Sequence, residues 1–135
     1  MRKTAVLVVL CLSFSVFAFA GKKFPLAGTS VSPASVGTVD VSVDKKNGNT
    51  KIKIKVEHMA PPGNLTPSMI GYVVWFQEQG GNAESQGRLR IDKNLKASFE
   101  TTTPWKNFDI IVTAENDPTV KAPTGPEVLK GSVRQ

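Results

Sequence analysis

Cysteine is almost absent from this sequence, which has Cys11 as its only thiol among 135 residues. Cys11 lies in an apolar segment near the N-terminus, so residues 21–135 contain none. That excludes disulfides, a thiol nucleophile and thiolate metal sites from this part of the chain. Histidine is equally scarce, since His58 is the only one.

The sequence also lacks the residue patterns of common enzymes. It has no G-x-S-x-G elbow, no G-x-x-x-x-G-K-[ST] phosphate loop and no H-E-x-x-H metal motif. Its 11 acidic residues are scattered, mostly over positions predicted to face solvent. We therefore expect a non-enzymatic protein that uses no cofactor.

The N-terminal segment, residues 1–20, has the features of a secretory signal peptide. Arg2 and Lys3 precede an apolar run, and Ala18-Phe19-Ala20 stands before Gly21. An A-x-A sequence at this place predicts cleavage between Ala20 and Gly21. The apolar run is short for a membrane span, which needs about 20 residues. An uncleaved anchor is the alternative.

These features predict a secreted or periplasmic protein, and a cysteine-free exported domain is more typical of bacteria than of animals. Loss of Arg2 and Lys3 lowers the formal charge from +6 to +4. Export, this modest charge and the few aromatic residues among the lysines argue against nucleic acid as a partner. We expect a monomer without a membrane span after cleavage, whose partner is a protein or another envelope component.

The remaining sequence predicts one domain of short strands. Residues 21–35 are small and polar and are expected to form an extended leader, followed by the domain at 36–135. Segments of β-branched and aromatic residues recur between turn signals, with no helix of useful length. They predict seven strands, at about 37–44, 51–58, 69–77, 87–91, 95–101, 108–114 and 128–133.

This pattern of strands predicts an all-β fold. We expect an antiparallel immunoglobulin-like β-sandwich, with a small barrel as the alternative. Trp75, on the third predicted strand, is expected to anchor the core.

A row of lysines raises the question of whether the chain has a cationic binding surface. Lys51, Lys53 and Lys55 alternate with apolar residues, and Asn47-Gly48 before them is a signal for a two-residue hairpin turn. The expected register opposes Asp44, Ser42 and Asp40 to the three lysines, and Val43, Val41 and Val39 to Ile52, Ile54 and Val56. We therefore expect a solvated strand face with local charge pairing, and a cationic docking site is the alternative.

Loops at the ends of the sandwich are the expected place for a binding surface, because a rigid scaffold can hold them in position. The candidates are Pro61, Pro62, Gly80, Gly81 and Trp105. Trp105 could serve as a platform for a carbohydrate ring or as a lid on one end of the core. We favour the lid.

Copper binding is the alternative function. Thioether and imidazole ligands suit Cu(I), and His58, Met59 and Met69 would supply them. However, neighbouring residues on a strand point to opposite faces, and methionines often fill gaps in a core. The preferred expectation is that no metal binds.

Four short motifs resemble a known family. They are Tyr72-Val73-Val74-Trp75, Gly87-Arg88-Leu89, Phe108-Asp109-Ile110-Ile111-Val112-Thr113-Ala114-Glu115, and Pro123-Thr124-Gly125-Pro126 followed by Val128-Leu129. In this order they resemble the extracytoplasmic C-terminal domain of anti-sigma-K factors of the RskA type. That family has a Y-x-(V/L)-W strand, a glycine-led strand, a (V)-T-x-E strand and a P-(T/S)-G-P ending. The resemblance covers residues 72–133.

The resemblance implies an exported β-sandwich without catalytic residues. Relatives of this type act in envelope signalling by holding a transmembrane regulator until it is cleaved. This sequence departs from that plan, because we expect neither a sigma-binding segment before its signal nor a membrane span after it. The resemblance therefore suggests a free-standing form of the sensor-side domain.

Overall fold

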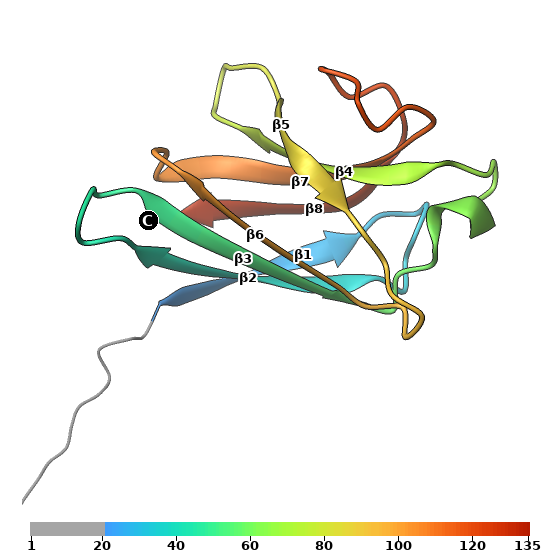
Figure 1. Cartoon of the computed structure of the whole chain (residues 1–135), viewed down its shortest axis with the longest axis horizontal. Helices are drawn as coiled ribbons and strands as arrows, with labels where there is room; N and C mark the ends of the chain where they lie inside the picture. The colour runs from blue at the N-terminus through green and yellow to red at the C-terminus, as the bar shows by residue number, and fades with distance from the viewer. Residues whose placement is uncertain (1–20) are drawn as a thin grey trace, which may run out of the picture.

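The computed structural model describes residues 21–135, which form eight β-strands (Figure 1). The strands are β1 (Lys22–Gly28), β2 (Val36–Val43), β3 (Thr50–Glu57), β4 (Gly71–Gln77), β5 (Glu84–Leu89), β6 (Ala97–Thr103), β7 (Asn107–Glu115) and β8 (Glu127–Arg134). The only helical element in this range is the short 3₁₀ turn η2 (Pro62–Asn64). The prediction of an all-β fold is confirmed.

Two expectations concern the membrane. The predicted signal peptide, residues 1–20, and its cleavage lie outside the described residues. Within residues 21–135, no helix is long and apolar enough to cross a membrane.

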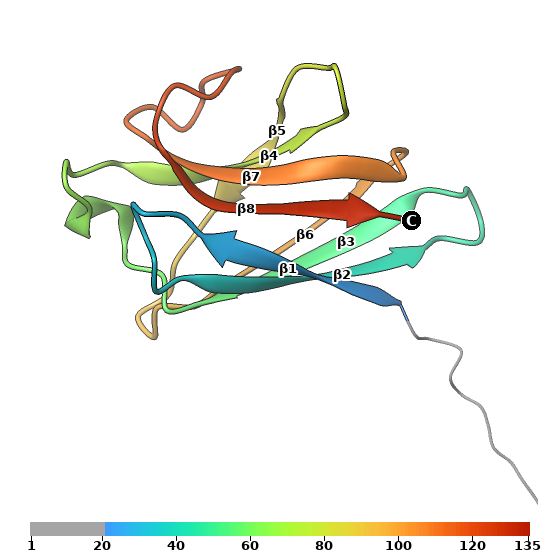
Figure 2. The same ribbon diagram turned by 180° about the vertical axis from the view of Figure 1, so that it is seen from behind.

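All strand pairs are antiparallel and belong to one sheet, in the order β5-β4-β7-β8-β1-β2-β3-β6. The sheet folds into two layers, β5-β4-β7-β8 over β1-β2-β3-β6 (Figures 1 and 2). The layers join where β8 meets β1, through the pairs Ala27↔Lys130 and Gly28↔Leu129. In an immunoglobulin-like sandwich, one layer holds the strands lettered A, B and E side by side, and the other holds C, F and G. Here β2, β3 and β6 take the places of A, B and E, and β4, β7 and β8 take those of C, F and G. The strand order within the two layers is therefore that of an immunoglobulin-like sandwich.

The strand that the sequence analysis did not predict is β1. It lies in the segment expected to be a leader, yet it pairs with β2 from Lys22 to Ala27 and places Leu26 in the core. The sheet therefore begins at Lys22. Pro25 and the flanking glycines weaken the strand signal in the sequence, because proline and glycine are both unfavourable inside strands.

The predicted register of the β2–β3 hairpin is wrong by two residues. Asp40 lies opposite Lys53 and Val41 opposite Ile52, whereas the two-residue turn would have opposed Asp40 to Lys55. The loop is longer because the Asp44 carboxylate accepts a hydrogen bond from the N–H of Lys46, and the Asp44 carbonyl accepts one from Gly48. A shift of two residues keeps the predicted alternation of faces, so Val39, Val41, Ile52 and Ile54 still point inward. Val43, predicted to belong to the same row, is 49% exposed at the end of β2.

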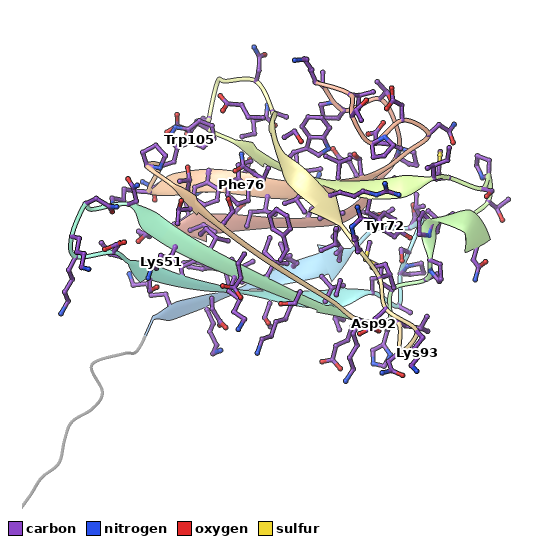
Figure 3. All side chains as sticks on the ribbon, viewed as in Figure 1. Lys51, Tyr72, Phe76, Asp92, Lys93 and Trp105 are labelled. Atoms are coloured by element: carbon purple, nitrogen blue, oxygen red, sulfur yellow. The ribbon has the colours of Figure 1, made fainter. Side chains whose placement is uncertain are left out.

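The core lies between the two layers. Tyr72, Phe76 and Phe108 are its largest members, and Figure 3 shows Tyr72 and Phe76 pointing into this space. The Phe76 and Phe108 ring centroids are 4.6 Å apart. The β-branched residues of β2 and β3 close the core from the other layer. The predicted central strands, β4 and β7, are central, since each is paired on both sides.

The edge strands β5 and β6 approach each other without being neighbours in the sheet. Gly87 on β5 has a φ of +139°, and a Cβ atom there would lie 3.1 Å from the ring of Phe99 on β6. Glycine is needed at this position because a side chain would be strained by the backbone and would press on the ring. This contact closes the side of the sandwich opposite the β8–β1 junction.

Candidate functional site

A buried acidic residue, Glu115, ties a long loop to the outer face of β4 and β7. Thr113 Oγ1 donates to Glu115 Oε2 at 2.6 Å and accepts from Trp75 Nε1 at 2.8 Å. Thr124 donates to Glu115 through its hydroxyl and its N–H, and the N–H of Gly125 donates as well. The loop 116–126 therefore lies over this outer face, where Figures 1 and 2 show it.

The environment of Glu115 explains why a carboxylate is tolerated with no exposed surface. Burial alone would raise its pKa, but the hydrogen bonds donated by Thr113, Thr124 and Gly125 outweigh burial and hold the pKa below its usual value of 4.5. Both oxygens accept hydrogen bonds from the protein, and the side chain has no exposed surface. Glu115 is therefore a structural group that positions a loop.

The network also corrects the expected role of Trp75. We expected Trp75 to anchor the core, and it is completely buried. However, it alternates along β4 with the core residues Tyr72, Val74 and Phe76, so it faces the outer side of that layer.

The predicted loop surface is divided between the two ends of the sandwich. Pro61 and Pro62 lie in the β3–β4 loop, where Tyr72 Oη donates to the Ala60 carbonyl at 2.7 Å, and burial raises the pKa of Tyr72 to about 12. The loops with Gly80-Gly81 and with Trp105 follow the other ends of the strands, and the Trp105 loop lies beside the β2–β3 loop through the hydrogen bond from Lys106 Nζ to the Gly48 carbonyl. The β4–β5 loop stands apart from them, above the upper layer (Figure 1). The five candidate residues therefore do not form one surface.

Trp105 lies at the end of the core, as the lid interpretation predicts. It is half-buried, packs against the core and has its ring centroid 6.4 Å from that of Phe108. Its backbone carbonyl accepts a hydrogen bond from Thr50 Oγ1 at 2.9 Å. Figure 3 shows it at the same end as Lys51.

The end that carries Pro61 and Pro62 also exposes apolar side chains that the sequence analysis did not select. Ile70 is 60% exposed, Leu95 42% and Val31 38%, and each lies in a different loop. We call these three residues the apolar loop end. The sequence alone does not show whether an apolar residue in a loop will be covered by other parts of the protein. The one signal here is Leu95, because leucine is unusual between the polar residues of a turn.

Two residues at this end have left-handed backbone conformations. His58 has a φ of +58° and Leu95 of +62°, and the Met59 N–H donates to the Leu95 carbonyl at 3.1 Å. A left-handed conformation costs a non-glycine residue about 1–2 kcal/mol. A cavity of about 570 Å³ lies beside His58, and it is lined further by residues of the loop 30–34, by Ala60 and by residues 64–66.

The three candidate copper ligands have different surroundings. Met59 is completely buried in the core, His58 is exposed and Met69 is half-buried against the core. Among residues 21–135 no group of three His, Cys, Asp or Glu side chains is placed to hold a metal ion. Met59 could therefore bind copper together with the exposed His58 only if its side chain left the core.

The row of Lys51, Lys53 and Lys55 lies on the outer face of the layer β1-β2-β3-β6, here called the lower layer, as predicted. The ion pairs on this face differ from the predicted ones. Lys23, Asp40, Lys53 and Glu100 lie side by side across β1, β2, β3 and β6, with alternating charge. Lys23 pairs with Asp40 at 2.6 Å and Lys53 with Glu100 at 3.9 Å. These four residues, together with Lys51, line a groove of about 870 Å³. Because cations and anions alternate, this row is unsuited to bind a ligand of one charge.

Comparisons of the sequence with known protein families and with curated proteins find no match.

Proposed function

We propose that this chain is an exported, non-enzymatic binding module of the bacterial cell envelope that holds a protein partner at its apolar loop end. The observation that carries this proposal is made at Leu95, whose apolar side chain remains 42% exposed and whose backbone has an energetically unfavourable left-handed conformation. Local strain of this kind is concentrated at functional sites, where something other than stability selects the residue.

The surroundings of Leu95 support a protein partner. Ile70 and Val31 expose further apolar surface at the same end, and loops on a rigid sandwich commonly carry recognition. The loops are held by several hydrogen bonds, including Met69 N–H to the Pro62 carbonyl at 2.9 Å and Ile70 N–H to the Glu115 carbonyl at 3.0 Å. A fixed surface loses little conformational entropy on binding.

The resemblance to the extracytoplasmic domain of anti-sigma-K factors supports the envelope role. Four residues from three of its motifs, Trp75, Thr113, Glu115 and Thr124, meet in one hydrogen-bonded network. Gly125 belongs to it as well, because its N–H donates to Glu115 Oε2. Glycine is needed there, since a Cβ atom would lie 1.8 Å from the Ala114 carbonyl oxygen. The shared residues thus include those that position the loop 116–126. We propose a free-standing relative of that sensor-side domain.

Site-specific photo-crosslinking in the producing cell tests the proposed function. A photoreactive residue at Val31, Ile70 or Leu95 should give the same adduct from all three positions. The same residue at Thr38 or Ser98, which are exposed on the outer face of the lower layer, should not give it. N-terminal sequencing of the captured chain should begin at Gly21. Adducts of equal yield at the control positions would contradict the proposal, whereas a captured chain that still begins at Met1 would identify the uncleaved anchor.

Leu95→Asn separates a binding role from a structural one. Asparagine accepts the left-handed conformation more readily than leucine, so the variant should unfold at equal or higher denaturant concentration. The same variant should lose most of the crosslinking from Ile70, because the apolar contact is removed. The alternative function makes a different prediction, which is Cu(I) uptake that is lost in His58→Ala.

A further inference from the structure

One end of the sandwich gathers lysines around the point where the described chain begins. Lys45 and Lys46 lie in the β2–β3 loop, Lys51 lies at the start of β3, and Lys106 Nζ donates to the Gly48 carbonyl of that loop at 2.6 Å. Lys22 lies opposite Val41 at the start of β1. We call Lys22, Lys45, Lys46, Lys51 and Lys106 the lysine end. Figures 1 and 2 both show the start of β1 and the β2–β3 loop at this end.

These five lysines are not used in ion pairs of the folded domain. Within residues 21–135 the five ion pairs use Lys23, Lys53, Lys96, Lys130 and Arg134, and none involves a lysine of this end. The acidic residues nearby include Asp44, which accepts a backbone hydrogen bond from Lys46, and Glu78 in the β4–β5 loop. Asp40 and Glu100 line one groove together with Lys51, but they pair with Lys23 and Lys53. The lysine end is therefore a net cationic surface, unlike the alternating row on the outer face of the lower layer.

We infer that the lysine end binds the surface of an anionic phospholipid bilayer. Two observations favour lipid over other anionic partners. Residue 21 follows directly on the predicted signal segment that ends at Ala20. If the chain is exported as proposed, it would leave the membrane at this end, or stay attached there if the segment is retained. Val43, which is 49% exposed, adds an apolar side chain next to the loop lysines. Basic residues combined with an exposed apolar group are typical of membrane-surface binding.

This arrangement would orient the domain on the membrane. The apolar loop end lies at the opposite end of the strands, so it would point away from the bilayer and stay accessible to a partner (Figure 1). The inference shares with the proposed function only the export of the chain. It does not depend on what binds at the apolar loop end.

Vesicle sedimentation of the chain 21–135 tests the inference. This part is a suitable sample because all eight strands lie within it. It should bind vesicles made of equal parts phosphatidylglycerol and phosphatidylcholine, and not vesicles of phosphatidylcholine alone. Binding should weaken as the salt concentration rises, because salt screens exposed charges. Equal binding to both vesicle types, or to neither, would overturn the inference.

Two charge-matched triple variants give the decisive comparison. Each lysine near an anionic membrane contributes roughly a fivefold gain in partition, so Lys45→Gln with Lys46→Gln and Lys51→Gln should weaken binding about a hundredfold. Lys55→Gln with Lys93→Gln and Lys121→Gln removes the same charge elsewhere and should bind nearly as the unmodified chain does. An equal loss in both variants would show that net charge alone matters and would overturn the inference. Neither triple variant should change crosslinking from Ile70, so this result is independent of the proposed function.

Discussion

Phe76→Ala should lower the free energy of unfolding by about 4 kcal/mol, since removal of a buried phenylalanine leaves both lost apolar contacts and a cavity. Phe76 is completely buried between the layers, and its ring lies against that of Phe108, which in turn contacts Trp105. Denaturant unfolding followed by tryptophan fluorescence measures the change, because Trp75 loses its buried environment when the domain unfolds.

Two further variants make this prediction specific. Ile70→Ala shortens an apolar side chain that is largely exposed, and it should change the free energy of unfolding by less than about 0.5 kcal/mol. Phe76→Leu keeps most of the volume and should cost less than about 2 kcal/mol, so it gives a folded sample if the alanine variant does not fold. A similar cost for Phe76→Ala and Ile70→Ala would contradict the placement of the core.

Glu115→Ala should lower the free energy of unfolding by about 3 kcal/mol, because it leaves buried hydrogen-bond donors without an acceptor. The affected donors are Thr113, Thr124 and Gly125, and the lost bonds should release the loop 116–126 from the outer face of β4 and β7. Amide hydrogen exchange at Thr124 and Gly125 should become much faster in the variant.

The matched control for this experiment is Glu78→Ala, which removes a carboxylate of the same kind from an exposed position in the β4–β5 loop. This variant should change the free energy of unfolding by less than about 0.5 kcal/mol and leave exchange at Thr124 and Gly125 unchanged. If Glu115→Ala behaved in the same way as Glu78→Ala, the assigned role of Glu115 in holding the loop would be wrong.

The pH dependence of the Glu115 contribution has a definite sign. A carboxyl group whose pKa is lowered by folding stabilises the protein fully above its usual pKa, and this contribution is lost as the pH falls through the lowered value. The pKa of Glu115 is below 4.5 in the folded chain. The difference in stability between the unmodified chain and Glu115→Gln should therefore narrow as the pH is lowered from neutral into this acidic range. A difference that stays constant would contradict the assigned network.

The faces of the strands could be predicted from sequence because side-chain alternation has a period of two residues. Ile52 and Ile54 are buried and Lys51 is exposed, as that alternation requires. The register could not be predicted, since it depends on how the Asp44 carboxylate and carbonyl close the loop. The same limit applies to β1, whose pairing with β8 joins residues about a hundred positions apart.

The candidate sites were harder to predict than the fold. The burial of Glu115 depends on donors from Thr124 and Gly125, which follow it in a loop with no periodic pattern. The exposure of Ile70 and Leu95 depends on how loops that are distant in the sequence meet at one end. Sequence patterns predict single strands well, but the Glu115 network and the apolar loop end each depend on contacts between different strands and loops.

The absence of cysteine from residues 21–135 allows the most direct test of the central claim, which is that alternation sorts this chain into a covered and a solvated face. Single cysteines at Lys53 and Ile54, which are neighbours on β3, can be compared by their rate of reaction with a maleimide under native conditions. We predict rapid labelling of Lys53→Cys, and labelling of Ile54→Cys only when denaturant is added. Rapid native labelling at position 54 with protection at position 53 would contradict the account.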